Sequence, residues 1–173
     1  PFDLAAAQRL LDSLGWKDDG SGVRKKDGRE LAFTILSPTS SKNRERCAVL
    51  IQDQLKRAGV RVTIRSLEAS TFHRLAAERD FDAVMQAWHF DASPATIRQI
   101  WSVKMANEAG SNNFGAYANA QFDAQIDSAL RASSLRESRP LFQRAYRTII
   151  DDAPAVWLYE LKTVIGYHRR IHL

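Results

Sequence analysis

The sequence predicts an α/β fold, a central mixed β-sheet flanked by helices, in a single domain over residues 1–173. A helix with strong apolar periodicity ends at Gly59 and passes directly into a segment of alternating apolar and polar residues. Residues 83–88 are apolar on both faces, which is typical of a central strand. No repeat or long linker divides the chain.

The first 36 residues predict a helix followed by a hairpin. Asp3 can cap a helix over residues 4–14, whose leucines and alanines share one face. The turn Lys26-Asp27-Gly28 lies between two expected strands, residues 23–25 and 31–36, and has the composition of a hairpin turn.

The clearest predicted helix begins after Ser40 or Ser41 and ends at Gly59. Its expected buried face carries Cys47, Leu50, Ile51, Leu55 and Ala58. The strand that follows covers residues 60–65, and its valines and isoleucine alternate with arginines and threonine.

The middle of the chain predicts a helix over residues 70–79, the central strand over 83–88, and a short helix that begins at Pro94. Residues 102–118 show no period and predict a long loop. Asn119 can cap the next helix, another helix follows Ser138 and Pro140, and residues 155–161 and 163–167 predict strands. The residues expected to face inward in these three helices are Ile97, Ile100, Trp101, Phe122, Ile126, Ala129, Leu130, Leu141, Ala145, Thr148 and Ile149.

Charge and hydropathy exclude several classes of function. The net charge is +5, but the basic residues are scattered and not interleaved with aromatic residues, so no nucleic-acid partner is expected. The longest apolar stretch, residues 153–159, is far shorter than the roughly 20 residues that span a bilayer. Residues 1–7 do not resemble a secretory signal, and we expect the chain to be a piece of a longer protein.

The sequence lacks the motifs of common catalytic sites, so we predict no enzyme activity and no cofactor. There is no glycine-rich phosphate loop and no nucleophile elbow. His168 and His172 are four residues apart in an expected terminal strand, where that spacing does not bring two side chains together as it does in a helix, so we predict no metal site. Cys47 lies on an apolar helix face, which favours an inert buried thiol over a nucleophile.

The segment from Trp88 to Pro94 is the best candidate for a binding site. It leaves the carboxyl end of the expected central strand, where open α/β sheets bind ligands. Asp91 could neutralise an ammonium group, while Trp88 and Phe90 supply flat apolar walls. Alternatively, Asp91 caps the Pro94 helix and Trp88 fills the core, and spacing alone does not decide.

Six segments in order resemble the extracellular solute-binding proteins of family 5, the dipeptide, oligopeptide and nickel receptors of bacterial ABC importers. They are residues 5–28, 51–60, 80–83, 88–94, 112–123 (including Asn112-Asn113-Phe114-Gly115-Ala116-Tyr117) and 152–159 (Asp152-Ala153-Pro154-Ala155-Val156-Trp157-Leu158-Tyr159). The resemblance implies the C-terminal ligand-binding lobe of a type II periplasmic-binding-protein-like receptor whose N-terminal lobe is missing from this chain. Two such lobes close over a peptide or similar small solute, and the closed form is recognised by the membrane permease. The implied location is periplasmic or extracellular, with membrane association through the permease or through a lipid anchor outside this fragment.

The resemblance also implies site residues. Asp91 matches the position that takes the α-ammonium of peptide ligands, and His89 and Phe90 lie beside it. The sequence departs from the family at Ser93, where an acidic residue is frequent, and at Met85, where some oligopeptide binders have an arginine for the ligand carboxylate.

Asn113 and Tyr117 are the remaining candidate ligand contacts, and the alternative is that they pin the long loop. The predicted ligand-binding residues are therefore Trp88, His89, Phe90, Asp91, Asn113 and Tyr117. An alternative function is the effector-sensing domain of a transcription regulator, because domains of this kind are also fused to DNA-binding motifs.

Overall fold

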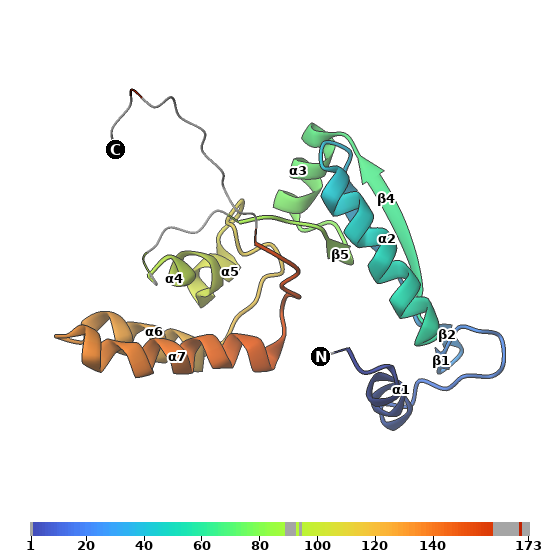
Figure 1. Cartoon of the computed structure of the whole chain (residues 1–173), viewed down its shortest axis with the longest axis horizontal. Coiled ribbons are helices and arrows are strands. Elements are labelled where there is room, and N and C mark those ends of the chain that lie inside the picture. The colour runs from blue at the N-terminus through green and yellow to red at the C-terminus, as the bar shows by residue number, and fades with distance from the viewer. Residues whose placement is uncertain (1, 89–92, 94, 161–169, 171–173) are drawn as a thin grey trace.

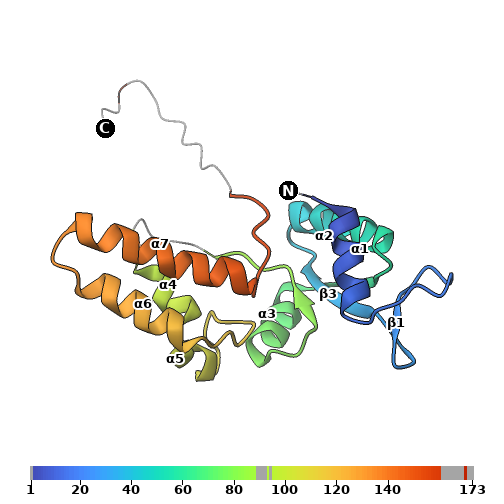
Figure 2. The same cartoon turned by 90° about the horizontal axis from the view of Figure 1, so that it is seen from below.

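The computed structural model describes residues 2–88, 93, 95–160 and 170. An α/β part, formed by residues up to Trp88, is followed by a part made of four helices (Figures 1 and 2). The α/β fold is confirmed. The extent of a single domain over the whole chain stays a prediction.

Three parallel strands form the sheet, in the order β4-β3-β5. β3 spans Ala32–Pro38, β4 spans Arg61–Leu67 and β5 spans Ala83–Val84. α2 (Lys42–Arg57) connects β3 to β4, and α3 (Ala69–Glu78) connects β4 to β5. Successive residues of β3 face opposite sides: Ile35 packs in one core cluster with Ala48 of α2, and Leu36 packs with Phe72 of α3. The two helices therefore cover opposite faces of the sheet.

The N-terminal helix α1 (Leu4–Ser13) packs against the same core cluster as α2. Its cap is Asp3, whose carboxylate accepts a hydrogen bond from the N–H of Ala6 at 2.8 Å, as predicted. β1 (Lys25–Lys26) and β2 (Arg29–Glu30) then form an antiparallel hairpin around the predicted turn. Lys17 adds an isolated antiparallel bridge to Lys25 of this hairpin, and within the described residues the three-stranded sheet is wholly parallel.

The helical part contains α4 (Thr96–Trp101), α5 (Val103–Asn107), α6 (Ala120–Arg131) and α7 (Leu135–Asp152). α6 and α7 form an antiparallel hairpin that packs against α4 (Figure 2). Their shared core consists of Ile97, Ile100, Trp101, Phe122, Ile126, Ala145 and Ile149, all of which the sequence predicted to face inward. None of the described helices is both long and apolar enough to cross a membrane.

The predicted central strand over residues 83–88 is wrong. β5 is only two residues long and lies at one edge of the described sheet, whereas β3 is the central strand. The apolar character of residues 83–88 has other causes, because Met85 packs with the α2 cluster and Trp88 packs against the helical core.

Two predicted apolar faces are partly wrong. Leu50 is 62% exposed and Leu130 is 42% exposed. In α2 the buried position next to Cys47 is Ala48, and Leu50 lies about 100–120° around the helix axis from the centre of the buried face.

Three further expectations are corrected. The long loop over residues 102–118 contains α5, which Ser102 caps by accepting from the N–H of Met105. α7 begins at Leu135, before the predicted start, because Ser134 caps the N–H of Glu137, and Pro140 lies inside the helix. Residues 155–160 form no strand and belong to neither of the described sheets, and residues 161 and 163–167 lie outside the described part.

Candidate functional site

Trp88 joins the two parts of the molecule. It follows β5, whose pairing with β3 ends where the N–H of Met85 donates to the carbonyl of Leu36 at 2.8 Å. Trp88 therefore lies past the carboxyl end of the sheet. The ring of Trp88 contacts those of Trp101 and Phe114, with centroids 5.6 and 6.1 Å apart. The indole N–H donates to the carbonyl of Asn112 at 3.1 Å. One side chain thus fixes the sheet edge, α4 and the loop before α6 together, while remaining partly exposed.

Asn113 holds this loop in shape. Its side chain is fully buried, at 0% exposure. Its amide group donates to the carbonyl of Tyr117 at 2.8 Å, and its amide oxygen accepts from the N–H of Tyr117 at 2.9 Å. The loop-pinning role accounts for these two hydrogen bonds, and the predicted ligand contact by Asn113 stays a prediction.

Tyr117 links the loop to the ends of α6 and α7. Its ring packs edge-on against Trp101 at 5.9 Å, and its hydroxyl donates to the Asp152 carboxylate at 2.7 Å. The same carboxylate oxygen accepts from the side-chain amide of Asn119 at 2.6 Å. Burial, and then the bond to Asp152, raise the pKa of Tyr117. The hydrogen bonds from Tyr117 and Asn119 lower the pKa of Asp152.

Trp157 is a residue that the site prediction missed. It follows α7, is 51% exposed, and packs against Trp101 with ring centroids 6.1 Å apart. The only signal in the sequence was its place in the segment from Asp152 to Tyr159. We call Trp88, Trp101, Phe114, Tyr117 and Trp157 the aromatic cluster. Trp101 is its buried centre, with 3% exposure, and the half-exposed Trp157 supplies a flat apolar surface with one N–H donor.

Three predicted site residues, His89, Phe90 and Asp91, lie outside the described residues, as does Pro94. Of their neighbours, the hydroxyl of Ser93 accepts from the N–H of Ala95 at 3.3 Å. The choice between ligand contact and helix cap for Asp91 therefore stays a prediction.

The remaining polar groups near the aromatic cluster serve the fold. Both carboxylate oxygens of Asp123 accept from the N–H of Val103 at the start of α5, at 3.2 and 3.3 Å. Within the part of the chain that the structure describes, no group of three or more His, Cys, Asp or Glu side chains could hold a metal ion. Cys47 is a free thiol, half-buried against the α2 core cluster. What the arrangement offers chemically is apolar contact and hydrogen bonding, which are the means of a ligand-binding site.

A parallel α/β unit with a partly exposed aromatic surface past the carboxyl end of its sheet is an arrangement typical of ligand-binding domains such as those of solute receptors. Residues 1–108 match the family described as bacterial extracellular solute-binding proteins, family 5 Middle. This match covers more than half of the chain, and the chain belongs to that family. By its description, the family consists of solute-binding proteins.

Relatives with known names support the assignment. The chain is similar to the oligopeptide-binding protein AppA of Bacillus subtilis, with 30% identity over 161 residues that cover 91% of this chain and 29% of that protein. It is also similar to protein XP55 of Streptomyces lividans, with 28% identity over 153 residues, 88% of this chain and 28% of that protein. The similarity to AppA, an oligopeptide-binding protein, favours the predicted binding function over the regulator alternative.

Solved structures show the same fold. AppA of Bacillus subtilis in complex with a nonapeptide superposes with a TM-score of 0.79 at 28% identity, covering 88% of this chain and 30% of that one. An oligopeptide ABC transporter binding protein of Thermotoga maritima gives a TM-score of 0.80 at 20% identity, covering 88% and 30%, and shows likeness of fold alone. The chain thus spans about three tenths of the length of the relatives it matches.

Proposed function

We propose that this chain is one ligand-binding lobe of the substrate-binding component of an ABC importer, which captures a peptide or a similar small solute. Membership of family 5 supports a role in extracellular solute binding. The similarity to AppA, whose structure holds a nonapeptide, favours peptides as the ligand class. The full receptor is then periplasmic or extracellular and delivers its solute to membrane permease subunits, to which it is bound directly or held near by a lipid anchor.

The observation that carries this proposal is the convergence of the aromatic cluster on Trp101. Trp88 comes from the sheet edge, Tyr117 from the loop before α6, and Trp157 from the segment after α7. These rings come from separate parts of the chain and pack on one another, so the surface is formed without a ligand. A preformed apolar surface binds with less loss of conformational entropy than one that must be ordered.

Capture by closure requires that the ligand touch both lobes. A ligand shifts an open–closed equilibrium only by its difference in affinity for the two states. The lobe described here supplies aromatic contacts, and Asp91 supplies a carboxylate for a ligand ammonium, as the resemblance implies. The second lobe, in the remainder of the parent protein, supplies the contacts that exist only on closure.

The test is calorimetry on the full-length parent protein with peptides of two to nine residues. We expect saturable binding, at least tenfold weaker binding in Trp88→Leu, and weaker binding in Asp91→Asn. Trp16→Leu, at a tryptophan in the N-terminal region, is the matched control and should retain full affinity. Circular dichroism confirms that each variant is folded. Absence of binding by every peptide contradicts the ligand class, and equal affinities in Trp88→Leu and Trp16→Leu remove the aromatic cluster from the site.

A further inference from the structure

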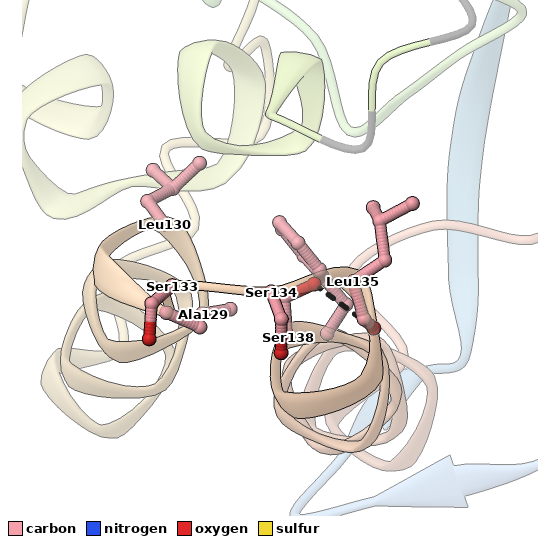
Figure 3. A pocket seen from close by; sticks show the side chains of 8 residues that line it. Ala129, Leu130, Ser133, Ser134, Leu135 and Ser138 are labelled. Atoms are coloured by element: carbon pink, nitrogen blue, oxygen red, sulfur yellow. Dashed lines mark hydrogen bonds between the residues drawn. The ribbon is translucent and has the colours of Figure 1, made fainter.

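A hollow lies at the tip of the α6–α7 hairpin, where the two helices are joined (Figure 3). Its volume is about 340 Å³. Leu130 from α6 and Leu135 from α7 project toward the same side, with Ser133 and Ser134 in the turn between them (Figure 3). Phe142, about two helical turns after Leu135 in α7, also lines the hollow. We call this feature the tip hollow.

Leu135 stands out among the exposed apolar side chains. It is 89% exposed, although it occupies the first position of an 18-residue helix where a polar residue would serve equally well. Leu130 of α6, which is 42% exposed, lies on the same side of the hollow, and adjoining exposed apolar side chains, unlike single ones, mark protein interaction sites. The energy of such sites is concentrated in a few apolar anchors that fill a pocket on the partner.

The tip is held rigid by hydrogen bonds. The Ser134 hydroxyl accepts from the N–H of Glu137 at 3.3 Å, and the Glu137 carboxylate accepts from the N–H and hydroxyl of Ser133 at 3.2 and 2.9 Å. Further along the hairpin, the Thr148 hydroxyl donates to the side-chain carbonyl of Gln125 at 2.8 Å. The hollow is therefore a preformed surface, and docking there needs little reordering.

The segment that forms the tip hollow, residues 129–142, carries three arginines and one glutamate, a net charge of +2. Arg131, Arg136 and Arg139 are exposed, and no described side chain forms an ion pair with any of them. The nearby carboxylate of Glu137 already accepts two hydrogen bonds from Ser133. Charge complementarity across an interface favours an acidic partner at such a surface and steers its approach.

The tip hollow is remote from the aromatic cluster. α7 begins at the tip with Leu135 and ends at Asp152, which bonds Tyr117 of the cluster, so its 18 residues separate the two features by about 27 Å at 1.5 Å per residue. In Figures 1 and 2 the turn between α6 and α7 lies at the end of the molecule away from α1 and α2. A partner can therefore occupy the tip while a solute occupies the cluster.

We propose that the tip hollow docks an acidic segment bearing a large apolar side chain on the outer face of the importer's membrane subunits. This inference rests on the proposed function. It assigns to the α6–α7 tip the contact between the receptor and the membrane subunits through which the solute is delivered. Leu135 and Leu130 provide the apolar contact, and the three arginines provide the complementary charge.

The test measures binding of the full-length parent protein to its importer's membrane subunits, reconstituted in lipid nanodiscs, by biolayer interferometry at 50 to 300 mM salt. Leu135→Asp and the double variant Arg131→Glu/Arg139→Glu should each bind at least tenfold more weakly, and the double variant should lose most of the salt dependence. Controls are Leu50→Asp, at a leucine of α2 that is 62% exposed, and Arg9→Glu/Arg46→Glu, at exposed arginines of α1 and α2. The controls should bind as the parent does.

Ligand affinity, measured in parallel, separates the two proposals. All four variants should keep the solute affinity of the parent, because none touches the aromatic cluster. Equal nanodisc binding in Leu135→Asp and Leu50→Asp overturns the docking surface and leaves the importer function standing. A parent protein that binds neither solute nor nanodiscs refutes both. A shift from dimer to monomer in Leu135→Asp, seen by analytical ultracentrifugation, overturns the membrane partner in favour of a second copy of the chain.

Discussion

Replacing Asn113 by alanine should unfold the loop that supports the aromatic cluster. The variant loses both hydrogen bonds between the Asn113 side chain and the backbone of Tyr117, at 2.8 and 2.9 Å. Asn113 is fully buried, so a Tyr117 N–H and carbonyl are left without these partners. Each unsatisfied buried group costs about 1–3 kcal/mol, so the free energy of unfolding should fall by about 3 kcal/mol. For a chain of this size the melting temperature should then fall by about 6–12 °C.

Urea unfolding followed by circular dichroism and tryptophan fluorescence measures this change. Asn107→Ala is the matched control, because the Asn107 side chain makes one exposed hydrogen bond, to the carbonyl of Val103 at 3.0 Å. The control should lose about 0.5 kcal/mol or less. If Asn113→Ala is no less stable than Asn107→Ala, the loop-pinning role of Asn113 is refuted.

Three further substitutions test other contacts. Arg24→Met removes a buried guanidinium that bonds Asp12 at 2.7 Å and two carbonyls, and should lower the free energy of unfolding by about 2–4 kcal/mol in urea. Gly59→Ala places a methyl group 2.8 Å from Arg24 Cγ at a φ of +84°, a backbone conformation that strains an alanine, and should lower the melting temperature followed by circular dichroism; an unchanged melting temperature would contradict this. In Asp152→Asn, the free energy of unfolding should fall less as the pH is lowered into the acid range. The hydrogen bond from Tyr117 lowers the pKa of Asp152 in the folded state. The stabilisation that Asp152 provides is therefore present above its unfolded pKa of about 3.8 and is lost as pH falls through the folded pKa. Urea titrations that give the same fall in the free energy of unfolding at acid pH for the parent and the variant would refute this.

The helices were the part of the fold that sequence predicted best. Asp3 and Asn119 cap α1 and α6 as expected, and the buried faces of α4 and α6 contain Ile97, Ile100, Phe122 and Ile126. Local signals suffice here, because a cap and a 3.6-residue period are properties of neighbouring residues.

The sheet was predicted less well because strand position depends on distant partners. Residues 83–88 and 155–160 have strand-like composition, yet only Ala83–Val84 finds a neighbour, through Ile35 and Leu36. Apolar composition does not distinguish a central strand from an irregular segment such as residues 85–88, in which Met85 packs on the α2 cluster and Trp88 on the helical core.

The candidate site was partly accessible from sequence. Trp88 was found through its place after an expected strand and Tyr117 through the motif resemblance, and the structure brings both to Trp101. Trp157 was missed, because it lies 56 residues after Trp101 and only the folded chain brings the two rings within 6.1 Å. The tip hollow was also missed, since the periodicity of α6 predicted that Leu130 would be buried.

The central claim is that the aromatic cluster forms part of a solute site, and amide hydrogen exchange on the full-length parent protein tests it most directly. With a peptide that binds in calorimetry, residues 85–88 and 111–118 should exchange more slowly than in the free protein, while the α6–α7 tip should be unchanged. Protection confined to other surfaces, with no change around Trp88 and Tyr117, would contradict the claim.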